Sequence, residues 1–394
     1  MFASRTDWRL EPNRFAAALE EHRRLGRPLL DLTNSNPTTC GFSYPEERIF
    51  AALSNRRALG YEPESLGLRH AREAIADYYR GRPGFFCSES SVNPERIVIT
   101  SGTSEAYNYV FRLLCDVGDE VLVPAPSYPL FEYLADLADV HPVPYPLNYD
   151  QGWQIDIPGP LNVLTGRSKA VMVVHPNNPT GSFIKRGEAH KLAEICVSHD
   201  LAIIADEVFL DYVDGTEPAC SFASDSPALT FTLSGLSKIS LLPQMKLGWI
   251  IVSGPAALVE PAMARLEVIG DTYLSASTPG QLALADMLAV RGDLQNQMRQ
   301  RVRSNLGFLD ALFPRGGSVE RLKREGGWYA VLRVPATSSD EDLAIELLER
   351  CDVLVHPGHF FDFSGDGFLV VSLIICEAEF QEGARRLRDF FLRA

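Results

Sequence analysis

Short apolar runs rich in β-branched residues alternate with amphipathic segments through the middle of the chain. The runs lie at residues 96–100, 120–124, 169–174, 201–205, 229–233 and 247–252. Near-continuous apolar runs of this length are typical of strands that are buried on both faces, and such strands alternating with helices indicate a mainly parallel sheet covered by helices. The pattern therefore predicts an α/β domain with this sheet at its centre.

The two ends of the chain have a different pattern. Residues 1–45 read as an N-terminal arm, with a short helix near 12–25 and then a segment rich in turn-forming residues. After about residue 255 long helical segments (281–312, 340–350 and 377–392) enclose a few strands, which indicates a smaller α+β domain. We expect a large domain over 46–265 and a small domain over 266–394, and we expect the arm to join the small one.

Composition restricts the classes of function. The chain has 394 residues, a net charge of -14 and a pI near 5.1, which argues against a surface for nucleic acid or for anionic membranes. No apolar run reaches the length of a transmembrane helix, and the N-terminus lacks a signal-peptide core. Seven scattered cysteines without a CxxC motif favour reduced thiols in a cytoplasmic protein over disulfides or a zinc site.

The stretch LTFTLSGLSK places Lys238 directly after an apolar strand. Partial burial near apolar walls lowers the pKa of an amine and frees its lone pair, as Schiff-base chemistry requires. A lone lysine after a strand is more often a surface residue. The neighbouring motifs change that interpretation.

Polar clusters follow the other strands, and ligands of parallel sheets bind at the carboxyl ends of their strands. SGTSEA (101–106) opens a helix after a strand, which suits a phosphate, although its hydroxyls also serve as N-caps. Asp206 ends an apolar strand and needs a cationic partner or a capping role. Asn178 lies in a PNNPTG turn, and Tyr128 in APSYP offers either a flat ring for a planar ligand or ordinary core packing.

In order and spacing, SGTSEA, PSYP, HPNNPTG, ADEVF and SGLSK resemble the class I/II aminotransferases, which are pyridoxal-phosphate enzymes of fold type I. The resemblance runs from about residue 30 to the C-terminus. It implies a large domain with a mainly parallel sheet between two helical layers, a smaller α+β domain, and a homodimer. It also implies exchange of an amino group between an amino acid and a 2-oxo acid.

The resemblance also implies a role for each motif residue. Lys238 would form the Schiff base with the cofactor and then move protons, and Asp206 would pair with the pyridine nitrogen. Asn178 would bond the ring oxygen, Tyr128 would stack on the ring, and Tyr61 would reach the phosphate of the neighbouring subunit. The phosphate site would comprise Ser101, Gly102, Thr103, Ser104, Ser237 and Lys246.

Three positions depart from the family pattern. Phe209 replaces a tyrosine that bonds the ring oxygen, so we expect the Schiff base to stay protonated to higher pH. Lys246 replaces an arginine, which keeps the charge but loses the bidentate geometry. Val370, in FLVVSL, replaces the arginine that clamps the substrate carboxylate. Candidates for substrate contact elsewhere are Asn36, His175, Arg333 and His359, with Arg69 and His356 as further cations, although each is more often structural or solvated.

The missing arginine leaves alternatives open. A lyase, decarboxylase, cyclase or amine transaminase of the same fold would keep the cofactor framework without a carboxylate clamp. A non-catalytic regulatory domain is disfavoured, because no DNA-binding module precedes this one. A nucleotide-dependent dehydrogenase would need a GxGxxG after the first strand, and the chain lacks it.

Overall fold

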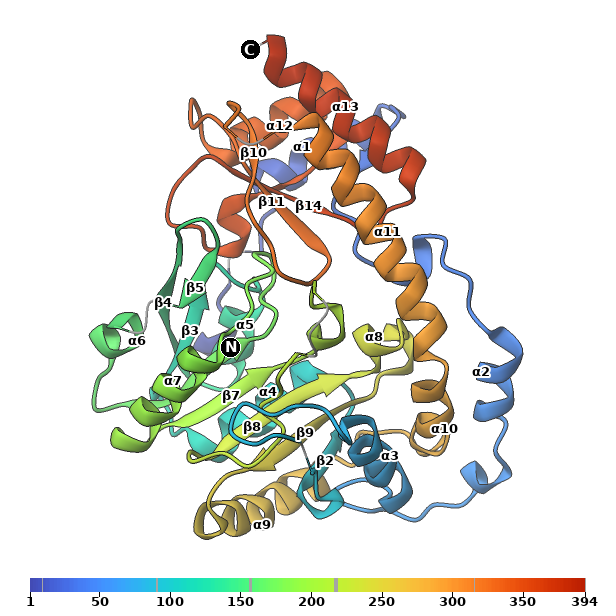
Figure 1. Ribbon diagram of the computed structural model, residues 1–394, viewed down its shortest axis with the longest axis vertical. Coiled ribbons are helices and arrows are strands. Elements are labelled where there is room, and N and C mark those ends of the chain that lie inside the picture. The colour runs from blue at the N-terminus through green and yellow to red at the C-terminus, as the bar shows by residue number, and fades with distance from the viewer. Residues whose placement is uncertain (9, 90, 156–157, 216–218, 315, 394) are drawn as a thin grey trace.

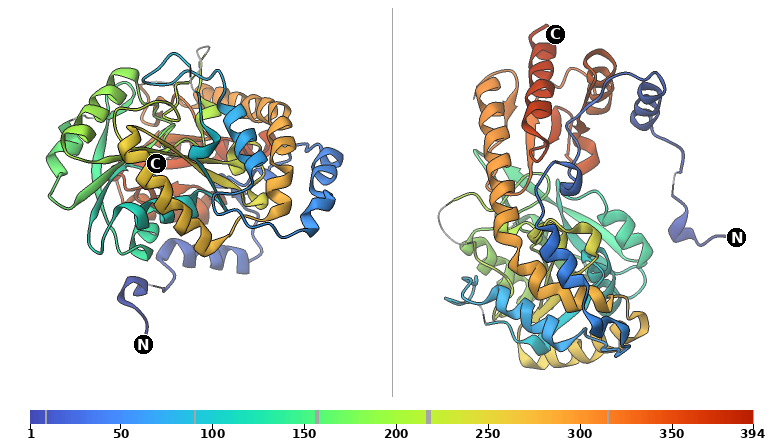
Figure 2. Two further views of the ribbon diagram at one scale, coloured as in Figure 1. Left: turned by 90° about the horizontal axis from the view of Figure 1, so that it is seen from below. Right: turned by 90° about the vertical axis from the view of Figure 1, so that its right-hand side faces the viewer.

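The computed structural model describes residues 1–394 except 9, 90, 156–157, 216–218, 315 and 394. The molecule has a lower part built on a large sheet and an upper part built on a small one, joined along one side by the long helix α11 (Arg291–Leu312) (Figure 1). The first residues extend away from the body (Figure 2).

The large sheet has eight strands in the order β2-β9-β8-β7-β6-β3-β4-β5. Strands β3, β4, β6, β7 and β8 pair in parallel, whereas β9 and β5 run antiparallel to their neighbours. The strands are β2 (Ile97–Thr100), β3 (Glu120–Ala125), β4 (His141–Tyr149), β5 (Trp153–Ile155), β6 (Ser168–Val174), β7 (Ala202–Asp206), β8 (Thr230–Gly235) and β9 (Gly248–Ser253). The mainly parallel α/β sheet predicted from the apolar runs is confirmed.

Alternate residues of these strands face opposite helical layers, as the two-residue repeat of a strand requires. Met172 packs in the cluster with α4 (Thr103–Leu114), α5 (Phe131–Leu137) and α9 (Ala256–Tyr273), while its neighbour Val171 packs toward α7 (Arg186–Ser198). At the other end of the sheet Trp249 and Ile99 pack in a third cluster with α3 (Arg69–Tyr79) and α10 (Thr278–Ala289). Both faces are therefore covered, which explains why the strands contain so few polar positions.

The upper part contains an antiparallel sheet in the order β10-β11-β14-β13. Its elements are β10 (Glu320–Arg321), β11 (Tyr329–Arg333), β13 (His356–Pro357), β14 (Phe368–Ser372), α12 (Asp340–Cys351) and α13 (Glu377–Arg393). In the N-terminal segment, α1 (Arg14–Arg24) packs on α12, and β1 (Leu30–Asp31) pairs with β12 (Val353–Leu354). The division at 265/266 stays a prediction. α9 passes through it without a break, and α10 packs on α2 (Glu46–Leu53) and α3.

Strand β4 carries prolines at alternate positions, Pro142, Pro144 and Pro146. The N–H of His141 points to β3, where it donates to the Asp119 carbonyl at 2.8 Å. The next residues alternate, so each proline nitrogen lies on the outer edge of the sheet, where it removes no bond of the β3–β4 ladder. No helix within the described ranges is long and apolar enough to cross a membrane.

Candidate active site

Five strands of the large sheet run in the same direction, and the residues at or just after their carboxyl ends lie at one edge of the sheet. Ser101 follows β2, Tyr128 follows the end of β3, Asn178 follows β6, Asp206 ends β7, and Lys238 lies just after β8. Because the carboxyl ends of parallel strands meet at one edge, motifs far apart in sequence become neighbours there. The upper part of the molecule lies over this edge (Figure 1).

Lys238 belongs to α8 (Leu236–Ile239), a single helical turn that starts directly at the end of β8. Its amine lies 4.7 Å from the ring centre of Trp328 and 5.5 Å from that of Phe209. Burial lowers the pKa of Lys238 to about 8, and the charge of Asp206 opposes this shift. Roughly a tenth of the amine is therefore uncharged at pH 7, far more than for an ordinary lysine, and nucleophilic attack on an aldehyde requires this neutral form.

Asp206 is buried and held by two donors. Tyr107 donates its hydroxyl to Oδ2 at 2.8 Å, and the Val208 N–H donates to Oδ1 at 3.0 Å. Burial raises the pKa of Asp206, while these bonds and the charge of Lys238 oppose the rise. A cation placed against this carboxylate would regain part of the lost solvation, so the position suits a protonated ring nitrogen.

The segment after β2 forms an anion cradle. Gly102 has φ +155° and ψ 173°, a conformation that side chains with a Cβ rarely adopt. A Cβ on Gly248 would come within 2.8 Å of the Gly102 backbone, so both glycines are needed for this close approach. The twelve-residue helix α4 begins at Thr103, and a Cβ on Gly102 would lie 3.8 Å from the Lys246 amine. A helix N-terminus beside a lysine favours a phosphate, although Glu105 accepts the Ser101 N–H at 2.7 Å within the same turn.

Two further cofactor candidates, Asn178 and Tyr128, each have a group that is still available to a ligand. Asn178 is buried, and its Oδ1 has no hydrogen-bond partner among the residues that the structure describes. Its neighbour Asn177 is fully used, since it bonds Ser127, Pro126 and Thr180. Tyr128 is partly buried and packs edge-on against Phe131 at 5.7 Å, so one ring face is not covered by that contact. The orphaned amide and the glycine cradle fit pyridoxal phosphate.

The substrate candidates differ in how far they are already engaged. His175 is fully buried, with Nε2 at 3.1 Å from the Cys220 carbonyl and Nδ1 accepting the Ile184 N–H, and burial lowers its pKa to about 3. Arg333 is exposed and pairs with Glu320 at 2.5 Å. Asn36 caps a 3-10 turn at 37–39, and His359 is exposed beside Phe360.

Val370 is fully buried and pairs across the small sheet with Val331 and His356. Residues paired across antiparallel strands point to the same side, so Val370 and His356 share a face. Burial lowers the pKa of His356 to about 4, which keeps it neutral at pH 7. Arg69, the further cation considered above, pairs with Glu73 and Glu95 on the surface of α3. Neither residue supplies a free cation beside Val370.

Comparison with known proteins supports the same interpretation. The model of the aminotransferase class I and II family matches residues 33–387. The chain belongs to the class I and II aminotransferases. Glutamate-pyruvate aminotransferase AlaA of Escherichia coli K12 is 32% identical over 90% of this aminotransferase and 89% of its own length. Alanine aminotransferase of Mycobacterium tuberculosis H37Rv is 28% identical over 96% and 88%.

Solved structures show the same fold. An Escherichia coli aminotransferase matches with a TM-score of 0.84 at 25% identity, covering 100% of this aminotransferase and 98% of that chain. Alanine aminotransferase of Pyrococcus furiosus matches with a TM-score of 0.88 at 22% identity and covers all of both chains. The predicted family and fold type are therefore confirmed, and the enzyme is a transferase of amino groups.

The structure adds site residues that sequence reasoning missed. Tyr107 lies one helical turn after Thr103, so the helical repeat places it on the sheet side of α4, next to Asp206. Trp328 and Tyr212 come from distant segments and pack together, with ring centres 5.2 Å apart. Spacing along the chain carries no signal for Trp328, because the fold alone brings it to Lys238.

Proposed function

We propose that this aminotransferase uses pyridoxal 5′-phosphate, held covalently by Lys238, to exchange an amino group between an amino acid and a 2-oxo acid. The observation that supports this most is the meeting of three groups at one sheet edge: a lysine with a lowered pKa, a buried carboxylate and a glycine-built anion cradle. When bound, the cofactor supplies an aldehyde and a ring that withdraws electrons from the substrate carbon.

The residues of the chain would divide the remaining work. Asp206 would keep the pyridine nitrogen protonated, and Asn178 would donate its side-chain amide N–H to the ring oxygen. Thr103 and the backbone at Gly102 would bind the phosphate, with Ser101, Ser104, Ser237 and the exposed Lys246 around it. Once free, the Lys238 amine would take and return the proton at the substrate α-carbon. Phe209 and Trp328 lie beside that amine and limit its contact with water.

The experiment is reconstitution with pyridoxal phosphate, reduction with borohydride and peptide mapping by mass spectrometry. We expect the label at Lys238 in the wild type and none in Lys238→Ala, while the exposed-lysine variant Lys191→Ala keeps it. A colourless wild-type protein without label at Lys238 would contradict the proposal.

The substrates are proposed from the relatives and tested directly. The names of the relatives make alanine, glutamate and pyruvate the first compounds to assay. Because Val370 offers no charge on its strand, the donor panel should include primary amines without a carboxylate. Turnover of alanine or glutamate supports an amino-acid donor, and turnover of amines alone would overturn that part of the proposal.

We also propose a homodimer and a cytoplasmic location. Tyr61 is 78% exposed in the isolated chain, which suits a residue that completes its contacts on a second subunit. All seven cysteines are free thiols. Sedimentation of the reconstituted enzyme should give twice the chain mass of 43.6 kDa, and Tyr61→Ala should weaken cofactor retention without changing the label position.

A further inference from the structure

The turn that carries Lys238 is too short to satisfy its own last carbonyl groups. A helix leaves its final carbonyls without internal partners, and α8 has only four residues. The Lys238 carbonyl accepts a local bond from the Leu241 N–H at 3.4 Å. Two side chains from other elements add shorter bonds. Tyr212, at the end of the 3-10 turn Leu210–Tyr212, donates its hydroxyl to the Lys238 carbonyl at 2.7 Å. Gln295, on α11, donates its amide to the Ile239 carbonyl at 2.8 Å.

Gln295 is itself fixed by charged partners. Its Nε2 also donates to Asp211 Oδ2 at 2.6 Å, and its Oε1 accepts from Arg299 at 3.2 Å. An ionised carboxylate only accepts and a guanidinium only donates, so these two neighbours fix which end of the amide faces Ile239. Both Nε2 hydrogens are used, one on Asp211 and one on the backbone of α8.

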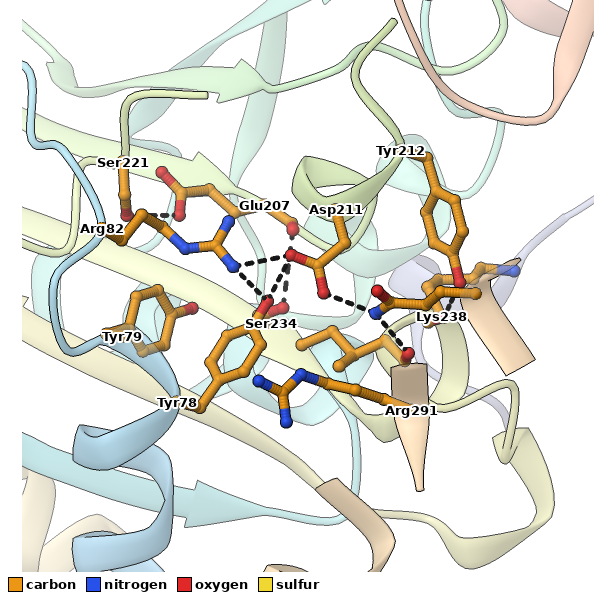
Figure 3. Close-up of polar contacts among 12 residues, drawn as sticks. Tyr78, Tyr79, Arg82, Glu207, Asp211, Tyr212, Ser221, Ser234, Lys238 and Arg291 are labelled. Carbon is orange, nitrogen blue, oxygen red and sulfur yellow. Dashed lines mark hydrogen bonds and ion pairs between the residues drawn. The ribbon is translucent and has the colours of Figure 1, made fainter. Parts of the chain in front are cut away.

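Asp211 is the centre of this network (Figure 3). Its Oδ1 accepts from Arg82 at 2.7 Å and from Tyr78 at 2.9 Å. Burial opposes its ionisation, but the charge of Arg82 and these hydrogen bonds outweigh burial and lower the pKa of Asp211. A buried carboxylate that stays ionised at neutral pH can orient Gln295 permanently. Figure 3 shows this network beside the separate hydrogen bond from Tyr212 to Lys238.

We propose that Tyr212 and Gln295, oriented by Asp211, are positioning residues that aim the Lys238 side chain between Phe209 and Trp328. Neither contacts the reactive amine. They act on the carbonyls of Lys238 and Ile239, and thereby fix the backbone from which the lysine side chain extends. The proposal rests on the proposed role of Lys238 as the reactive amine.

The test uses two variants with matched controls. Tyr212→Phe removes one hydroxyl and keeps the ring against Trp328, and Gln295→Leu removes the amide. Tyr145→Phe is the control for the first, because the buried Tyr145 donates to the Met172 carbonyl at the same 2.7 Å. Asn305→Leu is the control for the second, because Asn305 on the same helix α11 donates to the carbonyls of Leu373 and Ile375 at 2.9 Å.

The readout is the pH dependence of acylation at Lys238 in the cofactor-free protein, mapped by mass spectrometry. Asp206 is the charged group that acts on this amine, and it is unchanged in every variant. Release of the backbone lets the amine leave the two rings and regain water, so its reaction midpoint moves up from about 8. We expect a shift of at least about half a pH unit in Tyr212→Phe and more in Gln295→Leu, with no shift in either control.

Equal midpoints in all five proteins would show that the bonds serve stability only and would overturn the proposal. If Gln295→Leu does not fold, Tyr212→Phe alone decides, because it deletes a single hydroxyl. The borohydride label in the wild type tests the proposed function separately. A wild type that fails to take the label, but whose Tyr212→Phe variant shifts the midpoint, would refute the function and keep the positioning role.

Discussion

The two sheets of this enzyme deliver side chains in opposite ways. The large sheet runs mainly parallel, so five strand ends bring Ser101, Tyr128, Asn178, Asp206 and Lys238 to one edge. The small sheet is antiparallel, so consecutive strand ends fall at opposite edges and no such gathering follows. At its centre the buried Val370 lies between Val331 and His356 on the neighbouring strands. The parallel strands of the large sheet bring the candidate site residues together, whereas the antiparallel small sheet contributes buried apolar side chains.

The largest effect should come from replacing Lys238 at the edge of the large sheet. Lys238→Ala removes the proposed attachment point of the cofactor and the proposed proton carrier, so we expect about a 10⁴-fold loss of transamination rate. Steady-state rates with alanine and 2-oxoglutarate measure it. Lys191→Ala, on the exposed face of α7, should retain the wild-type rate. A Lys238→Ala enzyme within ten-fold of wild type would place the chemistry elsewhere.

Asp206→Asn separates charge from shape at the same edge. The rate should fall by about 10²–10³-fold, because the charge proposed to hold the proton on the cofactor ring is lost. The charge of Asp206 also raises the pKa of Lys238, so in the cofactor-free variant that pKa should fall below about 8. An acylation profile across pH 6–10 measures the shift, and an upward shift would contradict the assigned interaction.

Glu207 tests whether every acid at this edge belongs to the chemistry. It accepts from Ser221 at 2.7 Å and from the Phe222 N–H at 2.6 Å, and burial raises its pKa from 4.5 to about 7. The folded chain thus binds this proton more tightly than the unfolded chain, so stability falls as pH rises from about 4.5 to 7. The group accounts for about 3 kcal/mol of that fall.

Urea unfolding at pH 5 and pH 8 measures this contribution. Glu207→Gln should flatten the difference between the two pH values by about that amount. Exposed acids titrate in both proteins. The quantity to compare is therefore the change in unfolding free energy between pH 5 and pH 8. An unchanged value would show that Glu207 does not titrate in this range.

The smallest effect concerns Val370 in the small sheet. Val370→Thr places a hydroxyl in a fully buried apolar site and should cost about 1–2 kcal/mol of unfolding free energy. The midpoint of Lys238 acylation should stay where it is. Val117→Thr, at an exposed position, should cost nothing measurable. If Val370→Thr leaves stability intact and moves the Lys238 midpoint instead, Val370 belongs to the site and the contrast between the two sheets breaks down.

Local pattern explains what could be predicted. The apolar run at 169–174 predicts β6 (Ser168–Val174), and the run at 201–205 predicts β7 (Ala202–Asp206), each within one residue. The places of Asp206, at the end of β7, and of Lys238, just after β8, were predictable for the same reason, while their roles in the chemistry stay predictions. The sequence pattern does not predict the strand β4 at His141–Tyr149, because prolines at alternate positions normally argue against a strand. They are tolerated only because β4 lies near the sheet edge.

Residues that meet only through tertiary packing could not be predicted. Gln295 reaches Ile239 from α11, and Trp328 reaches Lys238 from the residue just before β11. No spacing along the chain encodes either contact. For His175, the sequence suggests a role that its contacts in the structure do not support. Its place beside the PNNPTG turn suggests a pocket residue, yet both of its ring nitrogens face backbone groups in the interior.

The proline pattern of β4 also governs how copies of the molecule meet. An extended peptide laid along that border would find carbonyl acceptors at Pro142, Pro144 and Pro146 but no amide donors, so intermolecular strand addition fails there. Copies of the molecule therefore do not associate by adding a strand at this border. Pro144→Val would restore one amide donor on that border and so weaken this protection.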